Sequence, residues 1–167
     1  MLGAEAVSFW AGVPKPGVDR GIAAAWLREG VARVLEHAER RGVAAALEPE
    51  PGMLVETLDD WIDLSRDLPT LTLALDLGHC LVTGEREPPA AVREFKASLG
   101  TVAIEDMRRG DHTHLPFGEG DMDIPACLDA LEAAGFPGLV CVELSRESHR
   151  ADTMVPRSLA WLRECRR

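Results

Sequence analysis

Five short apolar runs alternate with longer amphipathic segments along this 167-residue chain. The runs are rich in Val, Leu and Ala, whereas the segments between them repeat apolar residues at three- and four-residue steps. Strands that are apolar along most of their length are expected in parallel sheets, where both faces are covered. The pattern therefore predicts an α/β fold of five β-α units, with strands over 6–12, 43–50, 71–79, 101–107 and 138–145.

The segments between the runs carry helix signals. Thr57 is placed to cap a helix that opens with two aspartates, and Gly135 suits the position just after a helix end. No linker or shift of composition interrupts the series, so we expect one domain over residues 1–167. The helices are expected over 20–41, 57–66, 88–98, 124–134 and 153–165.

The bulk composition excludes several classes of protein. A formal net charge of −10 argues against nucleic acid as a partner, because phosphate contacts need a basic surface. The four cysteines are widely spaced without a CxxC pair, which indicates reduced thiols rather than a disulfide or zinc scaffold. We expect no secretory signal, and no apolar stretch reaches the roughly 20 residues needed to cross a membrane. We expect a soluble, cytoplasmic protein that acts on a small molecule.

Four successive apolar runs end in residues that can bind a metal or move a proton. Because the carboxyl ends of parallel strands meet at one edge of the sheet, these side chains are expected to converge there. The residues are Glu48 and Glu50 after the second run, Asp76 and His79 after the third, Glu105 and Asp106 after the fourth, and Glu143 after the fifth.

Each of these residues has a structural alternative. Glu48 is either a ligand or base at a strand end or a loop carboxylate before the next helix, and Glu50 is expected to be solvated. In the Asp-Leu-Gly-His sequence, Gly78 allows a sharp turn that would bring Asp76 and His79 to the same pocket. The alternative for His79 is a structural role.

Glu143 follows an otherwise apolar strand. A buried carboxylate must be paired or bound to a metal to offset its loss of hydration. Either Glu143 is such a ligand, or it forms a salt bridge to Arg146 or to Arg109.

Residues 104–124, IEDMRRGDHTHLPFGEGDMDI, combine six carboxylates, two histidines and two arginines, and we expect neither regular helix nor strand there. Arg108 and Arg109 either neutralise a phosphate or hydroxy-acid substrate or balance nearby acids. His112 and His114 are two residues apart, so in an extended chain both could reach one ion.

The second part of the same segment has a different prediction. From Gly118 onward the glycines indicate a turn. Asp121 or Asp123 is then placed to cap a helix that begins near Ile124, and capping is favoured over catalysis for both.

The chemistry of the candidate residues suits a divalent metal. Carboxylates with imidazoles, and no thiolates, favour Mn²⁺, Mg²⁺, Co²⁺ or Zn²⁺. The sequence holds no GxSxG, Walker A or GxGxxG motif, which argues against a serine nucleophile and a nucleotide cofactor.

The order LEPEPG, DLGH, IEDMRRGDHTHLPFGEGDMDI and GLVCVELSR resembles the xylose isomerase-like TIM-barrel superfamily, which includes sugar phosphate isomerases and epimerases and, more distantly, endonuclease IV. The resemblance runs from about residue 6 to the end. It implies a divalent metal at the C-terminal edge of the barrel that holds vicinal oxygens of a ketose or aldose, with a proton removed and returned next to the carbonyl through an enediolate.

Carried over by position, the resemblance also implies roles for individual residues. Glu48 and Glu143 would each be a metal ligand and an acid/base, Asp76 a ligand, His79 a contact to metal or substrate, Arg109 a substrate-binding residue, and His112 with His114 the loop that holds an extra metal in the endonuclease branch.

Two departures from the family bear on activity. Ala103 stands where the family's strand usually carries a metal-binding histidine, and only His112 or His114 could replace it from the loop. Five β-α units are also fewer than the eight, about 250 residues, of a full barrel. We therefore expect the C-terminal part of a TIM barrel, N-terminally truncated relative to the family, with an open edge exposed or covered by a second copy or a partner chain.

Three functions follow from these observations. The first is a metal-dependent sugar isomerase or epimerase. The second is a catalytically inactive partial barrel that serves as a binding module or is a remnant. An abasic-site nuclease is disfavoured by the acidic charge and the incomplete histidine set.

Overall fold

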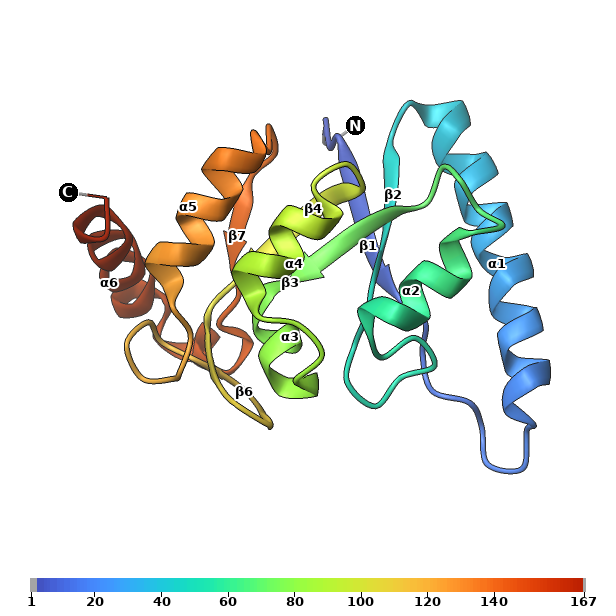
Figure 1. The fold of residues 1–167 in the computed structure, drawn as a ribbon, viewed down its shortest axis with the longest axis horizontal. Coiled ribbons are helices and arrows are strands. Elements are labelled where there is room, and N and C mark those ends of the chain that lie inside the picture. Colours follow the sequence, from blue (N-terminus) through green and yellow to red (C-terminus); the bar gives the residue numbers. More distant parts are fainter. Residues whose placement is uncertain (1–2, 167) are drawn as a thin grey trace. The chain divides into compact units, whose positions relative to one another are not determined.

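The structure is a computed structural model that describes residues 3–166, and it is a partial TIM barrel (Figure 1). A five-stranded parallel sheet has the strand order β1-β2-β3-β4-β7, and β5 pairs with β6 in a separate two-stranded sheet. The strands are β1 (Ala6–Trp10), β2 (Ala44–Glu48), β3 (Thr72–Asp76), β4 (Leu99–Ile104), β5 (Asp106–Arg108), β6 (Asp111–Leu115) and β7 (Val140–Val142). The helices are α1 (Arg20–Arg41), α2 (Leu58–Ser65), α3 (Leu77–Thr83), α4 (Pro88–Phe95), α5 (Ile124–Ala134) and α6 (Ala151–Glu164), with a 3-10 helix η1 (Ser145–Arg150).

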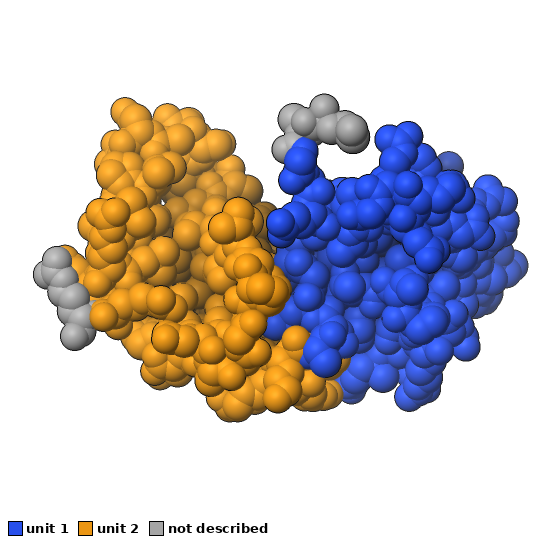
Figure 2. Space-filling model, turned by 90° about the horizontal axis from the view of Figure 1, so that it is seen from above, with its two compact units in different colours: residues 1–75, 97–101 blue, residues 76–96, 102–167 orange. Residues whose placement is uncertain are grey.

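The chain divides into two compact units, coloured separately in Figure 2. The first comprises Met1–Leu75 and Ala97–Thr101, and the second comprises Asp76–Lys96 and Val102–Arg167. That the chain forms a single domain stays a prediction. None of the helices within residues 3–166 is both long enough and apolar enough to cross a membrane.

In the first unit, β1 pairs with β2 along its whole length, from Ala6 opposite Ala44 to Trp10 opposite Glu48. Glycine at position 100 allows β4 to start close to β3, because a Cβ there would collide with the side chain of Thr72. The outer strand β1 is largely exposed, and Trp10 keeps 57% of its surface accessible. The expected exposed apolar flank is therefore present at this strand.

In the second unit, α5 begins and ends where the sequence predicts. The Asp123 side chain accepts a hydrogen bond from the Ala126 N–H, and Gly135 follows the helix with a left-handed φ of 66°. The strand β7 pairs with β4, and the Glu143 N–H continues the ladder by donating to the Ile104 carbonyl. These contacts fix the ends of β4 and β7, where the candidate site residues follow.

Two sequence predictions about local structure are wrong. The apolar run 71–79 is not one strand, because β3 ends at Asp76 and α3 begins at Leu77. Gly78 therefore lies in the first turn of a helix rather than in a sharp turn. Residues 104–124 are not irregular throughout, because β5 and β6 form an antiparallel hairpin within them.

Candidate functional site

Asp76 occupies the junction of β3 and α3. Its Oδ1 caps the helix by accepting hydrogen bonds from the Gly78 N–H at 2.8 Å and the His79 N–H at 3.1 Å. Its Oδ2 is buried, accepts no hydrogen bond among the described residues, and lies 3.7 Å from His79 Nε2. One oxygen of this carboxylate is thus fixed by the helix, while the other faces the histidines.

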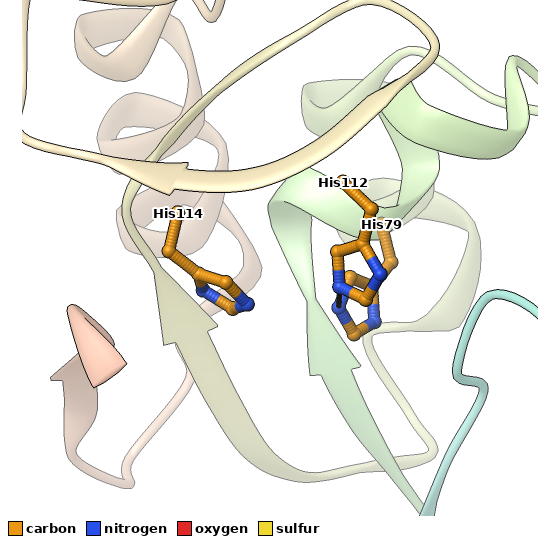
Figure 3. Close-up of side chains that lie close together, drawn as sticks. All are labelled: His79, His112 and His114. Atoms are coloured by element: carbon orange, nitrogen blue, oxygen red, sulfur yellow. Dashed lines mark hydrogen bonds between the residues drawn. The ribbon is translucent and has the colours of Figure 1, made fainter. Parts of the chain in front are cut away.

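Three imidazoles gather in the second unit (Figure 3). His112 and His114 lie on the same side of β6, and His79 comes from α3. The Nε2 atoms of His79 and His112 are 3.1 Å apart, and all three residues offer ligand nitrogens within 4.8 Å of one another. Two nitrogens bound to one ion at about 2.1 Å stand roughly 3.0–3.4 Å apart, so the spacing of His79 and His112 fits either a hydrogen bond or a shared ion.

Burial and the neighbouring imidazoles favour the neutral form of His112 by lowering its pKa. Burial lowers the pKa of His112 below its usual 6.5, and the neighbouring His79 and His114 lower it further. A neutral imidazole has a free nitrogen lone pair for a metal or a proton. Arg146, whose positive charge also acts on His112, is a cation near the histidines that the sequence reading considered only as a partner for Glu143.

Glu105 is the most deeply placed acid of the second unit, with no exposed surface. Its Oε2 lies 3.9 Å from His114 Nδ1, and Asp76, Glu105 and His114 offer ligand atoms within 4.8 Å of one another. From the sequence, Glu105 was predicted to lie at the end of a strand, but no role was assigned to it. Its position directly after an apolar strand was the available signal.

Asp106, the next residue, has a structural role. Its two oxygens accept hydrogen bonds from the Gly118 N–H at 2.9 Å and the Met122 N–H at 3.1 Å. Glycine is required at 120 because a Cβ there would lie 2.6 Å from the Met107 carbonyl and closer still to Asp106. The predicted turn from Gly118 is therefore held in place by Asp106.

Glu143 follows β7 and is half-buried. One of its carboxylate oxygens lies within 4.8 Å of a carboxylate oxygen of Asp76. Neither of the salt bridges considered for it, to Arg146 or to Arg109, forms among residues 3–166. The second unit therefore brings Asp76, His79, His112, His114 and Glu143 of the predicted set together with Glu105.

Glu48 belongs to the first unit, where it ends β2 and is 9% exposed. A carboxylate oxygen of Glu50 lies within 4.8 Å of one of Glu48, and Glu50 is half-buried rather than fully solvated. The position of Glu48 at a strand end is as the sequence predicts, and its role stays a prediction.

The two arginines of the hairpin contact acceptors outside the histidine cluster. Arg109 is exposed and forms an ion pair with Glu87 at 2.9 Å, while Arg108 donates to the Glu119 carbonyl at 3.4 Å. The Arg109 contact matches the alternative in which the arginines balance nearby acids, whereas the Arg108 contact is to a backbone carbonyl. Substrate binding by Arg109 stays a prediction.

Ala103 lies in β4 opposite Cys141 of β7. The strand itself thus offers no imidazole at this position, but His114 of β6 approaches Glu105, two residues further along the chain. Burial raises the pKa of Cys80 and raises that of Cys127 to about 12, so both thiols stay protonated and are poor nucleophiles.

The donor set fits a divalent cation. The clustered ligand residues of the second unit are three acids and three histidines, with no cysteine among them, a combination that suits Zn²⁺, Mn²⁺ or Co²⁺. They are Asp76, Glu105, Glu143, His79, His112 and His114. Two buried atoms, Asp76 Oδ2 and His114 Nδ1, make no hydrogen bond among the described residues. Buried polar atoms in native proteins nearly always have a partner, so a cation would account for both.

Solved structures share this fold at low sequence identity. The IolI protein, crystallised with a zinc atom, superposes with a TM-score of 0.79 at 21% identity, over 98% of this chain and 63% of that one. A D-tagatose 3-epimerase-like protein gives a TM-score of 0.75 at 21% identity, over 96% and 64% of the two chains.

Curated relatives match a shorter part of their own length. L-ribulose-5-phosphate 3-epimerase UlaE of Escherichia coli is 24% identical over 123 residues, which are 72% of this chain and 43% of the relative. An uncharacterised protein of Methanocaldococcus jannaschii is 27% identical over 122 residues, 68% of this chain and 41% of the relative. The chain thus spans about two fifths of these relatives. A sequence profile of the xylose isomerase-like TIM barrel matches residues 1–165, and the chain belongs to that family.

Proposed function

We propose that this chain is a divalent-metal-dependent isomerase or epimerase that acts on a small carbohydrate by proton transfer next to a carbonyl. The observation that carries the proposal is the cluster of buried and half-buried carboxylates and imidazoles in the second unit, with two polar atoms that make no hydrogen bond among the described residues. Sugar-epimerase relatives and a zinc-containing structural neighbour support the same class of substrate and cofactor.

In this proposal, different residues of the second unit bind the ion and transfer the proton. Asp76, His79, His112, His114 and Glu143 are the ligands available to the ion, which would supply a Lewis acid that polarises a carbonyl. The cap of α3 fixes Asp76 through one oxygen and leaves the other for binding. His112 is kept neutral by its surroundings, so it offers a lone pair at physiological pH.

Glu143 is our candidate for the proton transfer within this unit. It is half-buried and forms no ion pair among the described residues, so its carboxylate is available to accept a proton. Glu48, buried at the end of β2, is the second candidate, and the family resemblance is the reason for assigning it. Arg109 and Arg146 are the cations we propose to test for substrate binding.

Solvent exchange tests the proton transfer directly. The protein, loaded with Mn²⁺ or Zn²⁺, is incubated with a panel of ketoses and ketose phosphates in D₂O, and deuterium next to the carbonyl is followed by NMR. We expect Glu143→Gln and Glu48→Gln each to slow exchange by roughly 10²–10⁴-fold. Glu132→Gln, a change at an exposed acid on α5, is the matched control and is expected to change nothing.

Metal analysis separates this function from its alternative. If the purified protein binds no divalent metal and the substitutions leave exchange unchanged, the enzymatic proposal is wrong. The alternative, a catalytically inactive partial barrel, is favoured by one observation, the alanine in β4 at position 103. Ala103→His tests whether the metal site lacks one ligand at this position. A rise in metal affinity without exchange activity would support the catalytically inactive partial barrel.

We also propose that a second copy or a partner chain covers the exposed strand β1. Val7 and Trp10 are 50% and 57% exposed there, and an open strand edge is a template for pairing. Light scattering over a range of concentrations tests the first case, and a monomer at high concentration would contradict coverage by a second copy.

A further inference from the structure

Glu105 is fully buried beside a second carboxylate and an imidazole. It has no exposed surface, and the His114 imidazole stands at 3.9 Å from it, beyond hydrogen-bond distance. The Asp76 side chain, also without exposed surface, completes a group whose ligand atoms all lie within 4.8 Å of one another. Two buried carboxylates close together repel each other unless a proton or a cation lies between them.

Two atoms of this group point to a cation. Asp76 Oδ2 and His114 Nδ1 are buried and make no hydrogen bond among the described residues, although Asp76 Oδ1 has two donors. Leaving such atoms without a partner destabilises the folded chain. A positive ion in contact with both would remove this penalty and would lie beside the Glu105 carboxylate.

The first turn of α3 makes room for Glu105. A Cβ at position 78 would lie 2.7 Å from Met107 Sδ and closer still to Glu105 Oε1. The glycine therefore lets α3 approach the Glu105 carboxylate closely. This is a packing reason for the glycine of the Asp-Leu-Gly-His sequence.

We propose that Asp76, Glu105 and His114 bind one divalent cation, and that Glu105 takes the place of the strand ligand absent at Ala103. This inference deepens the proposed function and depends on it. Two carboxylates and one neutral imidazole balance a 2+ charge and leave coordination positions open for a substrate oxygen. Ligands of one ion stand at most about 4.2 Å apart, so a pair at the 4.8 Å limit must close by roughly half an ångström.

Cobalt binding by the full chain tests the assignment. Co²⁺ is titrated into metal-free protein and followed by its visible absorption and by calorimetry, for the wild type, Glu105→Gln and the surface control Glu132→Gln. An outer-shell partner of a metal ligand contributes roughly 10–100-fold to affinity. A direct ligand is expected to contribute more, so we expect Glu105→Gln to weaken Co²⁺ binding more than about 100-fold and to shift its absorption bands.

Stability without metal separates a ligand from a structural acid. Because Glu105 and Asp76 are two carboxylates buried close together, removing one of them is expected to leave metal-free Glu105→Gln at least as stable as the wild type. Lower stability with unchanged Co²⁺ affinity would overturn the inference. If Glu105→Gln does not fold, Glu105→Asp keeps the charge and withdraws the carboxylate by one methylene, and an unchanged Co²⁺ affinity in that variant overturns the inference equally.

The outcomes also distinguish this inference from the proposed function. Wild-type protein that binds no Co²⁺ contradicts both. Binding that is lost in Glu143→Gln but retained in Glu105→Gln contradicts the role of Glu105 alone and leaves the proposed function standing.

Discussion

Glu105 and Asp106 are adjacent acids, both buried, with opposite surroundings. Asp106 receives two backbone N–H groups from the loop that follows the hairpin, whereas Glu105 faces an imidazole and a second carboxylate. A carboxylate that accepts backbone hydrogen bonds stabilises the fold, and a carboxylate held beside other metal-binding groups is costly until a ligand arrives. With Glu105 as the proposed metal ligand, burial alone does not distinguish it from the structural acid Asp106.

The largest expected difference between the two acids is in stability. Asp106→Ala leaves two backbone donors without their acceptor, and we expect it to lower the free energy of unfolding by about 3 kcal/mol. Glu105→Gln is expected to change it by less than about 1 kcal/mol in metal-free protein. Urea unfolding followed by circular dichroism measures both. Equal losses in the two variants would remove the distinction.

The glycines beside the two acids give the next effect. Gly120→Ala and Gly78→Ala place a methyl group against Asp106 and Glu105 respectively, and we expect each to destabilise by about 1–3 kcal/mol. Gly30→Ala is the matched control, because this glycine lies within α1 with open space around its Cα. It should stabilise by about 0.5–1 kcal/mol. Only Gly78→Ala should also weaken Co²⁺ binding.

A smaller effect is expected from the Asp123 cap of α5, which lies in the part of residues 104–124 that follows Gly118. Asp123→Ala removes the acceptor for the Ala126 N–H and should destabilise by about 1 kcal/mol. Metal affinity should not change. Thermal unfolding and Co²⁺ titration of the same sample check the two statements together, and a loss of Co²⁺ binding would extend the functional region past Gly118.

The smallest effect concerns pH. The pKa of His112 is lower in the folded chain than the usual 6.5, so between those two values the unfolded chain binds more protons. Stability is therefore lost as the pH falls below about 6.5, and it is retained above that value. His112→Gln should reduce the fall in Tm between about pH 7 and pH 5 in metal-free protein, and His149→Gln, at an exposed histidine, should not. An unchanged slope in His112→Gln would contradict the assignment.

Local signals in the sequence predicted much of the fold. Helix α1 follows from its three- and four-residue repeat of apolar residues. Thr57 caps α2 as predicted, and Asp60 completes a capping box. Asp123 and Gly135 delimit α5 as expected. These features depend on residues within four positions of one another, which a sequence displays directly.

The features that the sequence did not predict depend on distant partners. Helix α3 is buried along most of its length, so its residues lack a polar face and merge with the preceding strand. The hairpin β5–β6 lacks the alternation of apolar and polar residues that signals a strand pair. The partners that separate Asp106 from Glu105 lie 12 and 16 residues away, and no local pattern encodes them.

The β5–β6 hairpin, a two-stranded ribbon, carries His112 and His114, while the third clustered histidine, His79, belongs to α3. An isolated pair of strands is only marginally stable in water. An ion shared by His79 and His112 would therefore act as a cross-link between ribbon and helix, and its binding energy would slow local opening of the ribbon. Amide hydrogen exchange at residues 106–115 would then report ion binding even where no substrate is known.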